Sequence, residues 1–331
     1  MGSLEKLSIE SAECVAYRAS RPLPLEGVIE IVVSTPESRA ICNDPFVRGV
    51  DYTRKLACAS SRALTALRGA HLFGGTEQTT SVLTILRGGL NFGLREALAD
   101  AFGWNNHSTW YISAQRQLTD PKSGAWEIVE DSYTKMAVSG EMDVVFGDVV
   151  ATGTSLKHAF MKLTEGLTRS SRYRSITFFT VGGGASGEIV AEWRRLIESR
   201  QGSPLRAVVV YFEGIFGVAG PATPLTIKLD GTDLLRRDGT LAPEFVTSQY
   251  TNPLYPLERC TIYDAGSRAF HVPEYLEDVV DYWRQVAALA ANGTTFKDLL
   301  AERCPEVDPE RFRTVDLGTI ARAHLAKLTA V

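Results

Sequence analysis

The sequence has few cysteines and no long apolar run. Its 331 residues include five cysteines, and no two of them have the CxxC spacing of a thiolate zinc site or a redox pair. An odd number of scattered cysteines argues against a disulfide scaffold and suits a reducing compartment. No stretch approaches the roughly 18 apolar residues of a membrane span, and the N-terminal residues lack a signal-peptide core. We therefore expect a cytoplasmic protein that does not associate with membranes.

A strong charge of one sign is also lacking. The formal net charge is -4 at pH 7, which gives no bulk attraction to nucleic acid or to an anionic lipid surface. The five histidines show no spacing typical of a metal site, and no nucleophile elbow of a serine hydrolase is visible. We expect no nucleic-acid partner.

The middle of the chain alternates strand-like and helix-like segments. Strands are predicted at residues 81–89, 108–117, 125–136, 142–150, 175–184 and 205–214. The helix-sized spacers between most of them predict a mostly parallel sheet with right-handed crossovers. The predicted fold class is α/β, with a mostly parallel central sheet, helices on both faces, and N- and C-terminal additions.

Three regions follow from this pattern. Residues 1–75 form an N-terminal flanking segment, residues 76–220 the core, and residues 221–331 a C-terminal extension or hood. The extension begins with loops rich in Pro, Gly and Asp. An amphipathic helix is then predicted at 272–291, where we expect it to cover the core or to form a subunit contact.

The stretch "DVVFGDVVATGTSLKHAF" (143–160) places an aspartate, Asp148, at the end of an apolar strand. The residues that follow and open a helix are Ala151, Thr152, Gly153, Thr154 and Ser155. Ligands of parallel sheets bind outside the carboxyl ends of the strands, and the free amides and dipole of a helix start favour a phosphate dianion. Asp148 would face the sugar hydroxyls or the waters of a metal ion. An ordinary strand–turn–helix connection with a Thr or Ser cap is the alternative.

The segment "VVFGDVVATGTSL" resembles the phosphoribosyl-pyrophosphate signature of type I phosphoribosyltransferases. The upstream segment "LTILRGGLNFG" resembles the pyrophosphate loop of that family, in the arginine-containing form of the uracil phosphoribosyltransferases. The order of the motifs also agrees over roughly residues 76–215. In that family a mobile connector closes over the active site, and here residues 118–124 take its place.

The resemblance implies Mg²⁺-dependent transfer of a phosphoribosyl group from phosphoribosyl pyrophosphate to a nucleobase or related nitrogen heterocycle. It implies that residues 151–155 bind the 5′-phosphate and that Asp148 takes part in catalysis. Few direct protein ligands to the metal are expected, and the protein would act as a homodimer in nucleotide metabolism. The residues that would meet the pyrophosphate are Arg87, Gly88 and Gly89.

Three basic residues near the connector are further candidates. Arg116 and Lys122 would add positive charge to the site when the connector closes, and Lys135 is comparable to Lys122. Ordinary solvation at the surface is the alternative for Lys122.

The sequence departs from the family at one position. Many members carry two adjacent acids in the signature, whereas here Gly147 precedes a single acid, Asp148. Either hydroxyl recognition or metal placement is therefore altered. A non-catalytic sensor of phosphoribosyl pyrophosphate or of a nucleotide is the alternative function, and a reverse reaction or a hydrolysis at the same carbon is a third.

Two other segments border the predicted site. "VGGGASGE" (181–188) resembles a second phosphate loop weakly, and a flexible strand-to-helix turn is the favoured interpretation. In "YFEGIFGVAG" (211–220), Glu213 would read N–H donors of an acceptor. Phe212 or Phe216 would stack on its ring, with core packing as an equal alternative.

Overall fold

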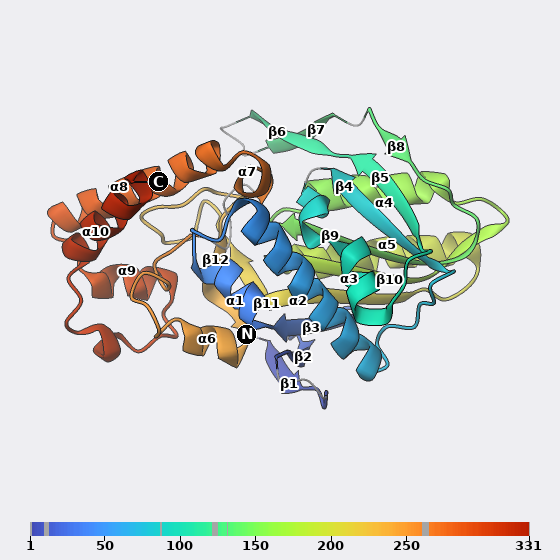
Figure 1. Cartoon of the computed structure of the whole chain (residues 1–331), viewed down its shortest axis with the longest axis horizontal. Helices are drawn as coiled ribbons and strands as arrows, with labels where there is room; N and C mark the ends of the chain where they lie inside the picture. Colours follow the sequence, from blue (N-terminus) through green and yellow to red (C-terminus); the bar gives the residue numbers. More distant parts are fainter. Residues whose placement is uncertain are drawn as a thin grey trace.

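The computed structural model describes residues 2–9, 13–86, 88–120, 125–130, 132–259 and 265–330, with only the backbone of residues 88, 90, 115–120 and 125–130. Its strands are β1 (Ser3–Lys6), β2 (Val15–Ser20), β3 (Val28–Ser34), β4 (Thr80–Leu86), β5 (Ser108–Ser113), β6 (Gln115–Asp120), β7 (Ala125–Glu130), β8 (Thr134–Lys135), β9 (Gly140–Val150), β10 (Ser171–Gly183), β11 (Arg206–Val218) and β12 (Leu234–Leu241). Ten of them form one sheet in the order β1-β2-β3-β11-β10-β9-β4-β5-β8, with β12 paired to β11 (Figure 1). β6 and β7 form a separate hairpin.

The centre of this sheet is parallel. β3, β11, β10, β9, β4 and β5 run in the same direction, whereas β1, β2, β8 and β12 pair antiparallel at its margins. The inner strands are almost continuously apolar because helices cover both of their faces, as residues 144–146 of β9 illustrate with at most 1% exposure. The predicted α/β class with a mostly parallel sheet is confirmed.

Helices lie on both sides of the sheet. They are α1 (Pro36–Asn43), α2 (Gly49–Gly69), the 3₁₀ helix η1 (Gly88–Phe92), α3 (Leu94–Phe102), α4 (Thr154–Gly166), α5 (Ala185–Gln201), α6 (Pro243–Ser248), α7 (Ala265–Phe270), α8 (Val272–Ala291), α9 (Phe296–Arg303), the 3₁₀ helix η2 (Pro309–Phe312) and α10 (Leu317–Thr329). Figure 1 shows α2 and α3 on the near side of the sheet and α4 and α5 behind it. Successive residues of β9 face opposite sides of the sheet: Phe146 packs against Phe160 of α4, whereas Gly147 faces η1.

Two predicted strands are each divided in the structure. The prediction at 108–117 covers β5 and the start of β6, which belong to different sheets, and the prediction at 125–136 covers β7 and β8. The predicted strand at 81–89 ends at Leu86, because its glycines enter η1. α3 ends at Gly103, which adopts the left-handed conformation at φ 71°.

Both flanks of the chain are joined to the core. β3 lies inside the sheet between β2 and β11. The C-terminal helices have an apolar cluster of their own around Trp283 of α8, and they lie beside the β12 end of the sheet (Figure 1). Buried Arg268 donates to the carbonyl oxygens of Ile41, Asp44 and Val47 and so ties α7 to the α1–α2 connection. The division of the chain at residues 75 and 220 stays a prediction.

Among the helices that the structure describes, none combines the length and the apolarity needed to cross a membrane.

A buried aspartate joins three strands near their amino ends. Asp143 of β9 is 1% exposed and accepts hydrogen bonds from Thr79 Oγ1 (2.7 Å), next to β4, and from Ser175 Oγ (2.6 Å) on β10. Arg174 of β10 pairs with the same carboxylate. Hydrogen bonds to a buried charged group contribute more than neutral ones, so this residue should matter to the free energy of unfolding.

We predict that Asp143→Ala lowers the free energy of unfolding by about 2–3 kcal/mol, because several donors lose their acceptor. Urea denaturation measures the change. The matched control is Glu141→Ala, which removes a solvent-exposed pair with Arg172 and should cost under about 0.5 kcal/mol. Equal effects of the two substitutions would contradict the prediction.

Candidate functional site

The turn between β9 and α4 has the geometry of an anion site. Gly153 precedes the helix in the left-handed conformation at φ 84°, and a β-carbon at this position would overlap Ile189 of α5. The positive φ favours glycine here, and any larger residue would also have to displace the end of the Ile189 side chain. The α4 N-terminus has no side-chain cap and no acidic residue in its first turn, so its first N–H groups and the positive end of its dipole are left for a ligand.

Hydroxyl groups surround these amides. Thr152 is exposed, and its Oγ1 lies 3.4 Å from Oγ1 of Thr154, within hydrogen-bonding distance. Thr154 and Ser155 are half-buried, whereas Ala151 is buried at 2%. The predicted residues 151–155 are therefore one compact turn that presents hydroxyls and amides together.

Asp148 stands at the carboxyl end of β9 beside this turn. The residue is 8% exposed, and its Oδ1 accepts a hydrogen bond from the backbone N–H of Val149 at 2.9 Å. In the register of the sheet it lies opposite Thr180 of β10. The carboxylate is thus positioned by the strand rather than by a mobile loop.

The second motif lies directly against the first. Gly89 of η1 is buried, and a β-carbon on it would lie 3.0 Å from the carbonyl oxygen of Gly147. Gly88 opens the same 3₁₀ helix, while Arg87 lies outside the described residues. The two segments that resemble ligand loops therefore meet at one edge of the sheet, next to Asp148.

Phe92 explains the glycine that precedes Asp148. A β-carbon at Gly147 would lie 2.5 to 2.8 Å from three carbons of the Phe92 ring, so no acid fits at this position without displacing the ring. Phe92 is fully buried and stacks on Phe212, whose ring in turn stacks on Phe179. Sequence reasoning did not single out Phe92, although a glycine inside a strand is a known sign of close approach.

The two phenylalanines of β11 pack in the core instead of presenting their rings to an acceptor. Phe212 is 0% exposed within the stack just described, and Phe216 is 3% exposed with its ring edge-on to Phe245. Both side chains are core residues.

The basic candidates lie around the β6–β7 hairpin. Arg116 is in β6, opposite Ile128 of β7, and only its backbone is described. Lys135 is an exposed residue of β8, and Lys122 lies outside the described residues. The hairpin approaches α4, the helix that begins at the phosphate-type turn. Catalytic roles for Arg116 and Lys122 stay predictions.

The glycine-rich segment at 181–188 is a strand-to-helix turn closed by an arginine. Arg21 donates to the carbonyl oxygen of Gly184 (2.8 Å) and forms two hydrogen bonds of 2.6 Å with Glu30 of β3. Tyr211 Oη donates to the same carboxylate at 2.8 Å. This arrangement agrees with the favoured interpretation of a turn.

Glu213 is fully buried and engaged by protein donors. Its carboxylate accepts hydrogen bonds from Ser34 Oγ (2.7 Å), from the backbone N–H of Thr35 (3.1 Å) and from the hydroxyl of Ser38, all at the β3–α1 junction. Its φ of 66° is unusual for a residue other than glycine. With the carboxylate directed at α1, its contact with an acceptor stays a prediction that this arrangement does not favour.

A magnesium ion fits this donor set only in one way. Among the described residues, no three His, Cys, Asp or Glu side chains converge on a point, and position 147 has no room for a second acid. Mg²⁺ commonly keeps several waters and is held by one or two carboxylates together with ligand phosphates. The single carboxylate of Asp148 beside an anion turn suits that mode.

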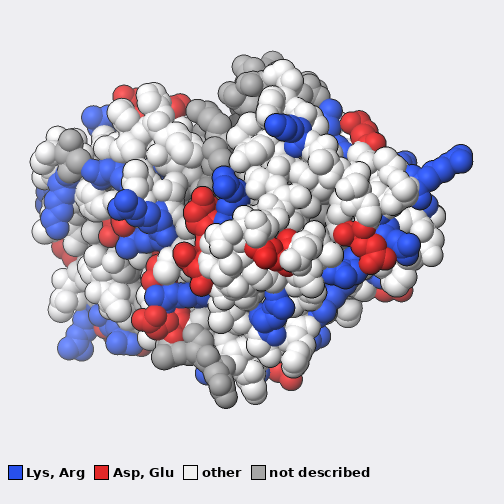
Figure 2. Space-filling view, turned by 45° about the vertical axis from the view of Figure 1, so that its right-hand side comes forward, with Lys and Arg blue, Asp and Glu red and all other residues white. Residues whose placement is uncertain are grey.

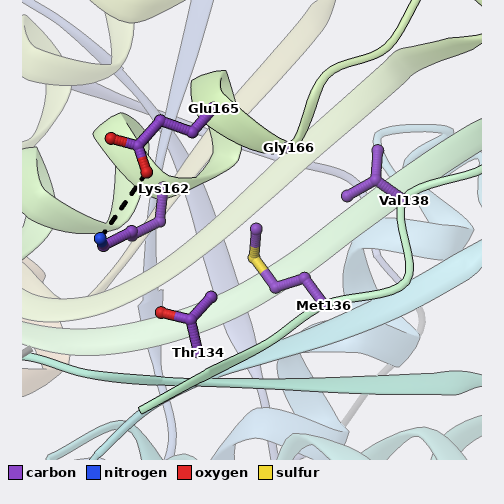
Figure 3. A pocket seen from close by; sticks show the side chains of 6 residues that line it. All are labelled: Thr134, Met136, Val138, Lys162, Glu165 and Gly166. Carbon is purple, nitrogen blue, oxygen red and sulfur yellow. Dashed lines mark ion pairs between the residues drawn. The ribbon is translucent and has the colours of Figure 1, made fainter. Parts of the chain in front are cut away.

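The surface pocket shown in Figure 3 is separate from the candidate site. It encloses about 460 Å³ and is lined by Thr134, Met136, Val138, Lys162, Glu165 and Gly166. Lys162 and Glu165 form an ion pair of 3.6 Å on its wall. The lining residues of α4 belong to its C-terminal half, roughly 12 to 18 Å along the helix from the phosphate-type turn.

Figure 2 shows basic and acidic side chains interspersed over one face of the molecule, without a broad area of either charge. This agrees with the small net charge.

Neither a family model nor a curated protein matches the sequence. Among solved structures, the chain is similar to a hypoxanthine-guanine phosphoribosyltransferase from Bacillus anthracis, with 18% identity and a TM-score of 0.25 over 38% of this chain and 70% of that chain. It is also similar to a hypoxanthine-guanine phosphoribosyltransferase from L. donovani, with 13% identity and a TM-score of 0.28 over 58% and 95%. These values are too low to assign a family.

We predict that Gly147→Ala lowers the free energy of unfolding by about 1–3 kcal/mol, because the new methyl group overlaps the Phe92 ring. In a Phe92→Leu background the penalty should shrink, and a double-mutant cycle in urea measures that coupling. Gly69→Ala is the control, since a β-carbon there meets nothing within 4 Å. A penalty that is the same in both backgrounds would show that the ring is not the cause.

Glu213 predicts a second, pH-dependent effect. Burial raises the pKa of its carboxyl group from 4.5 to about 7, although the hydrogen bonds from Ser38 and Ser34 oppose the rise. The folded state therefore holds this proton more tightly than the unfolded state. The associated stability is complete below about pH 4.5 and is lost as the pH rises through 7.

Glu213→Gln removes this titration. We expect the stability of the variant relative to the wild type to increase by about 3 kcal/mol between pH 4.5 and pH 8, at about 1.4 kcal/mol per pKa unit. Urea denaturation at a series of pH values measures it, with Glu277→Gln on the surface of α8 as the control. A pH-independent difference between variant and wild type would refute the prediction.

Proposed function

We propose that this protein transfers a phosphoribosyl group from phosphoribosyl pyrophosphate to a nitrogen heterocycle and releases pyrophosphate. The observation that carries the proposal is the contact between the two motifs. The uncapped turn 151–155 lies at the end of β9, and Gly89 lies against the same strand at Gly147. A ligand with a phosphate at one end and a diphosphate at the other matches two anion turns on either side of one carboxylate.

The chain's own groups would then do three things. The amides and hydroxyls of residues 151–155 hold the 5′-phosphate, and the turn at Gly88 and Gly89 holds the diphosphate, where glycine permits close approach. Asp148 faces the ribose hydroxyls or the water shell of a magnesium ion. That ion, when bound, neutralises charge on the leaving group.

The reaction itself needs little covalent chemistry from the protein. A ring nitrogen of the acceptor forms a bond to the anomeric carbon as the bond from that carbon to the pyrophosphate oxygen breaks. The electron pair leaves with the pyrophosphate, and the acceptor loses its ring proton. Positioning and exclusion of water dominate such a displacement.

One observation favours a second function. Phe92 fills the space where a side chain at position 147 would project, so the acid pair implied by the resemblance is excluded and not simply missing. A protein that binds phosphoribosyl pyrophosphate or a nucleotide as a sensor, without turnover, needs only the two anion turns.

The test is to incubate the protein with phosphoribosyl pyrophosphate, Mg²⁺ and a panel of purine and pyrimidine bases that includes uracil, and to follow pyrophosphate release. Turnover with one base supports the transferase, and release without a base supports hydrolysis. Tight binding with no release supports the sensor. Absence of binding would contradict all three.

Variants locate the site. Ser155→Ala removes one hydroxyl from the phosphate turn. It should raise the dissociation constant for phosphoribosyl pyrophosphate about 10- to 100-fold, the range for a hydrogen bond to a charged group. Ser170→Ala, an exposed residue beyond the other end of α4, is the control and should leave affinity unchanged. An unaltered affinity of the Ser155 variant would place the phosphate elsewhere.

A further inference from the structure

A loop of the C-terminal region reaches the phosphate-type turn. β11 continues into residues 219–233, and the loop is closed at its base by hydrogen bonds from Ala219 N–H to Asp233 O (2.9 Å) and from Gly231 N–H to Ala219 O (2.8 Å). The chain turns at Gly231, close to this base, with φ 67°, and a β-carbon there would lie 3.4 Å from the Thr152 methyl group. Gly231 therefore lies beside the turn that the proposed function assigns to the 5′-phosphate.

Asp233 fixes the shape of the turn at residues 229–233. The residue is 1% exposed, its Oδ2 accepts a hydrogen bond from Leu229 N–H (2.9 Å), and its own N–H donates to Leu229 O (3.0 Å). Its Oδ1 pairs with Arg259 at 2.6 Å, where both side chains are almost entirely buried. A buried pair of this kind is costly to break because the remaining charge loses its partner.

The Asp233–Arg259 pair is linked through Glu258 to the core of the C-terminal helices. Glu258 Oε1 accepts a hydrogen bond from the backbone N–H of Arg259 (2.9 Å), and its Oε2 accepts one from Trp283 Nε1 of α8 (2.7 Å). His324 of α10 lies 3.4 Å from the same oxygen. Hydrogen bonds and ion pairs thus connect α8 and α10 to Asp233, whose turn contains Gly231 beside Thr152.

We infer that Asp233 is a positioning residue for the phosphate site: it holds the 229–233 turn against Thr152 and so orients the Thr152 hydroxyl toward the start of α4. The inference rests on the proposed function. The turn acts by packing and not by its charges, since Lys228 is paired with Asp230 (3.1 Å) and donates to the carbonyl oxygens of Gly220 and Pro221. With the Thr152 methyl group held on one side, its Oγ1 faces that of Thr154.

The test compares Asp233→Asn with Asp281→Asn, which removes an exposed pair with Arg284 on α8. Two quantities are measured on the full chain: hydrogen exchange of the amides of residues 152–156 without ligand, and the dissociation constant for ribose 5-phosphate. Asp233→Asn should raise the exchange rate and the dissociation constant, each on the order of tenfold. Asp281→Asn should change neither quantity.

Thr152→Ser provides a second test of the same contact in case the Asp233 variant does not fold. It keeps the hydroxyl but deletes the methyl group that touches the turn, so it should also raise the exchange rate and the dissociation constant. In the double variant the effects should be less than additive, because both substitutions remove one contact.

The outcomes separate the two hypotheses. Faster exchange at 152–156 in the Asp233 and Thr152 variants supports the positioning role, whether or not ribose 5-phosphate binds. Unchanged exchange and affinity in both overturns it. Failure of the wild type to bind either ribose 5-phosphate or phosphoribosyl pyrophosphate overturns the proposed function instead.

Discussion

The close packing of η1 on β9 is the constraint on which the candidate site depends. Gly89 and Gly147 bring two backbones together, and the Phe92 ring occupies the space that a side chain at position 147 would need. Because Phe92 belongs to the stack with Phe212 and Phe179, this approach is built into the core of the sheet. Two loops that are distant in the sequence are thereby brought together near Asp148.

The same packing determines which chemistry the site can support. A second carboxylate beside Asp148 is sterically excluded, so a metal ion at this edge would be held by one protein carboxylate and by oxygens of the ligand. The amides and the dipole at the start of α4 place partial positive charge at this edge.

The flanking regions take part in this architecture. β3 supplies the strand beside β11, and the β3–α1 junction supplies donors to the buried Glu213 carboxylate. On the other side, the loop 219–233 extends from β11 to Thr152, with Asp233 and Arg259 connecting it to α8 and α10. Both additions are therefore integrated with the strands that carry the site.

The sequence by itself determined the α/β class, the parallel centre of the sheet, and the turn at 151–155, since apolar periodicity, helix spacing and a glycine at a helix start are local signals. It also placed the two glycine-rich motifs in order. Only the tertiary structure decided why Gly147 is glycine and that Glu213 is directed at α1. It alone showed that Gly231 lies beside Thr152. These features depend on the proximity of Phe92 to β9, of β11 to the β3–α1 junction, and of the C-terminal loop to the turn before α4, and no local pattern specifies contacts between segments so far apart in the chain.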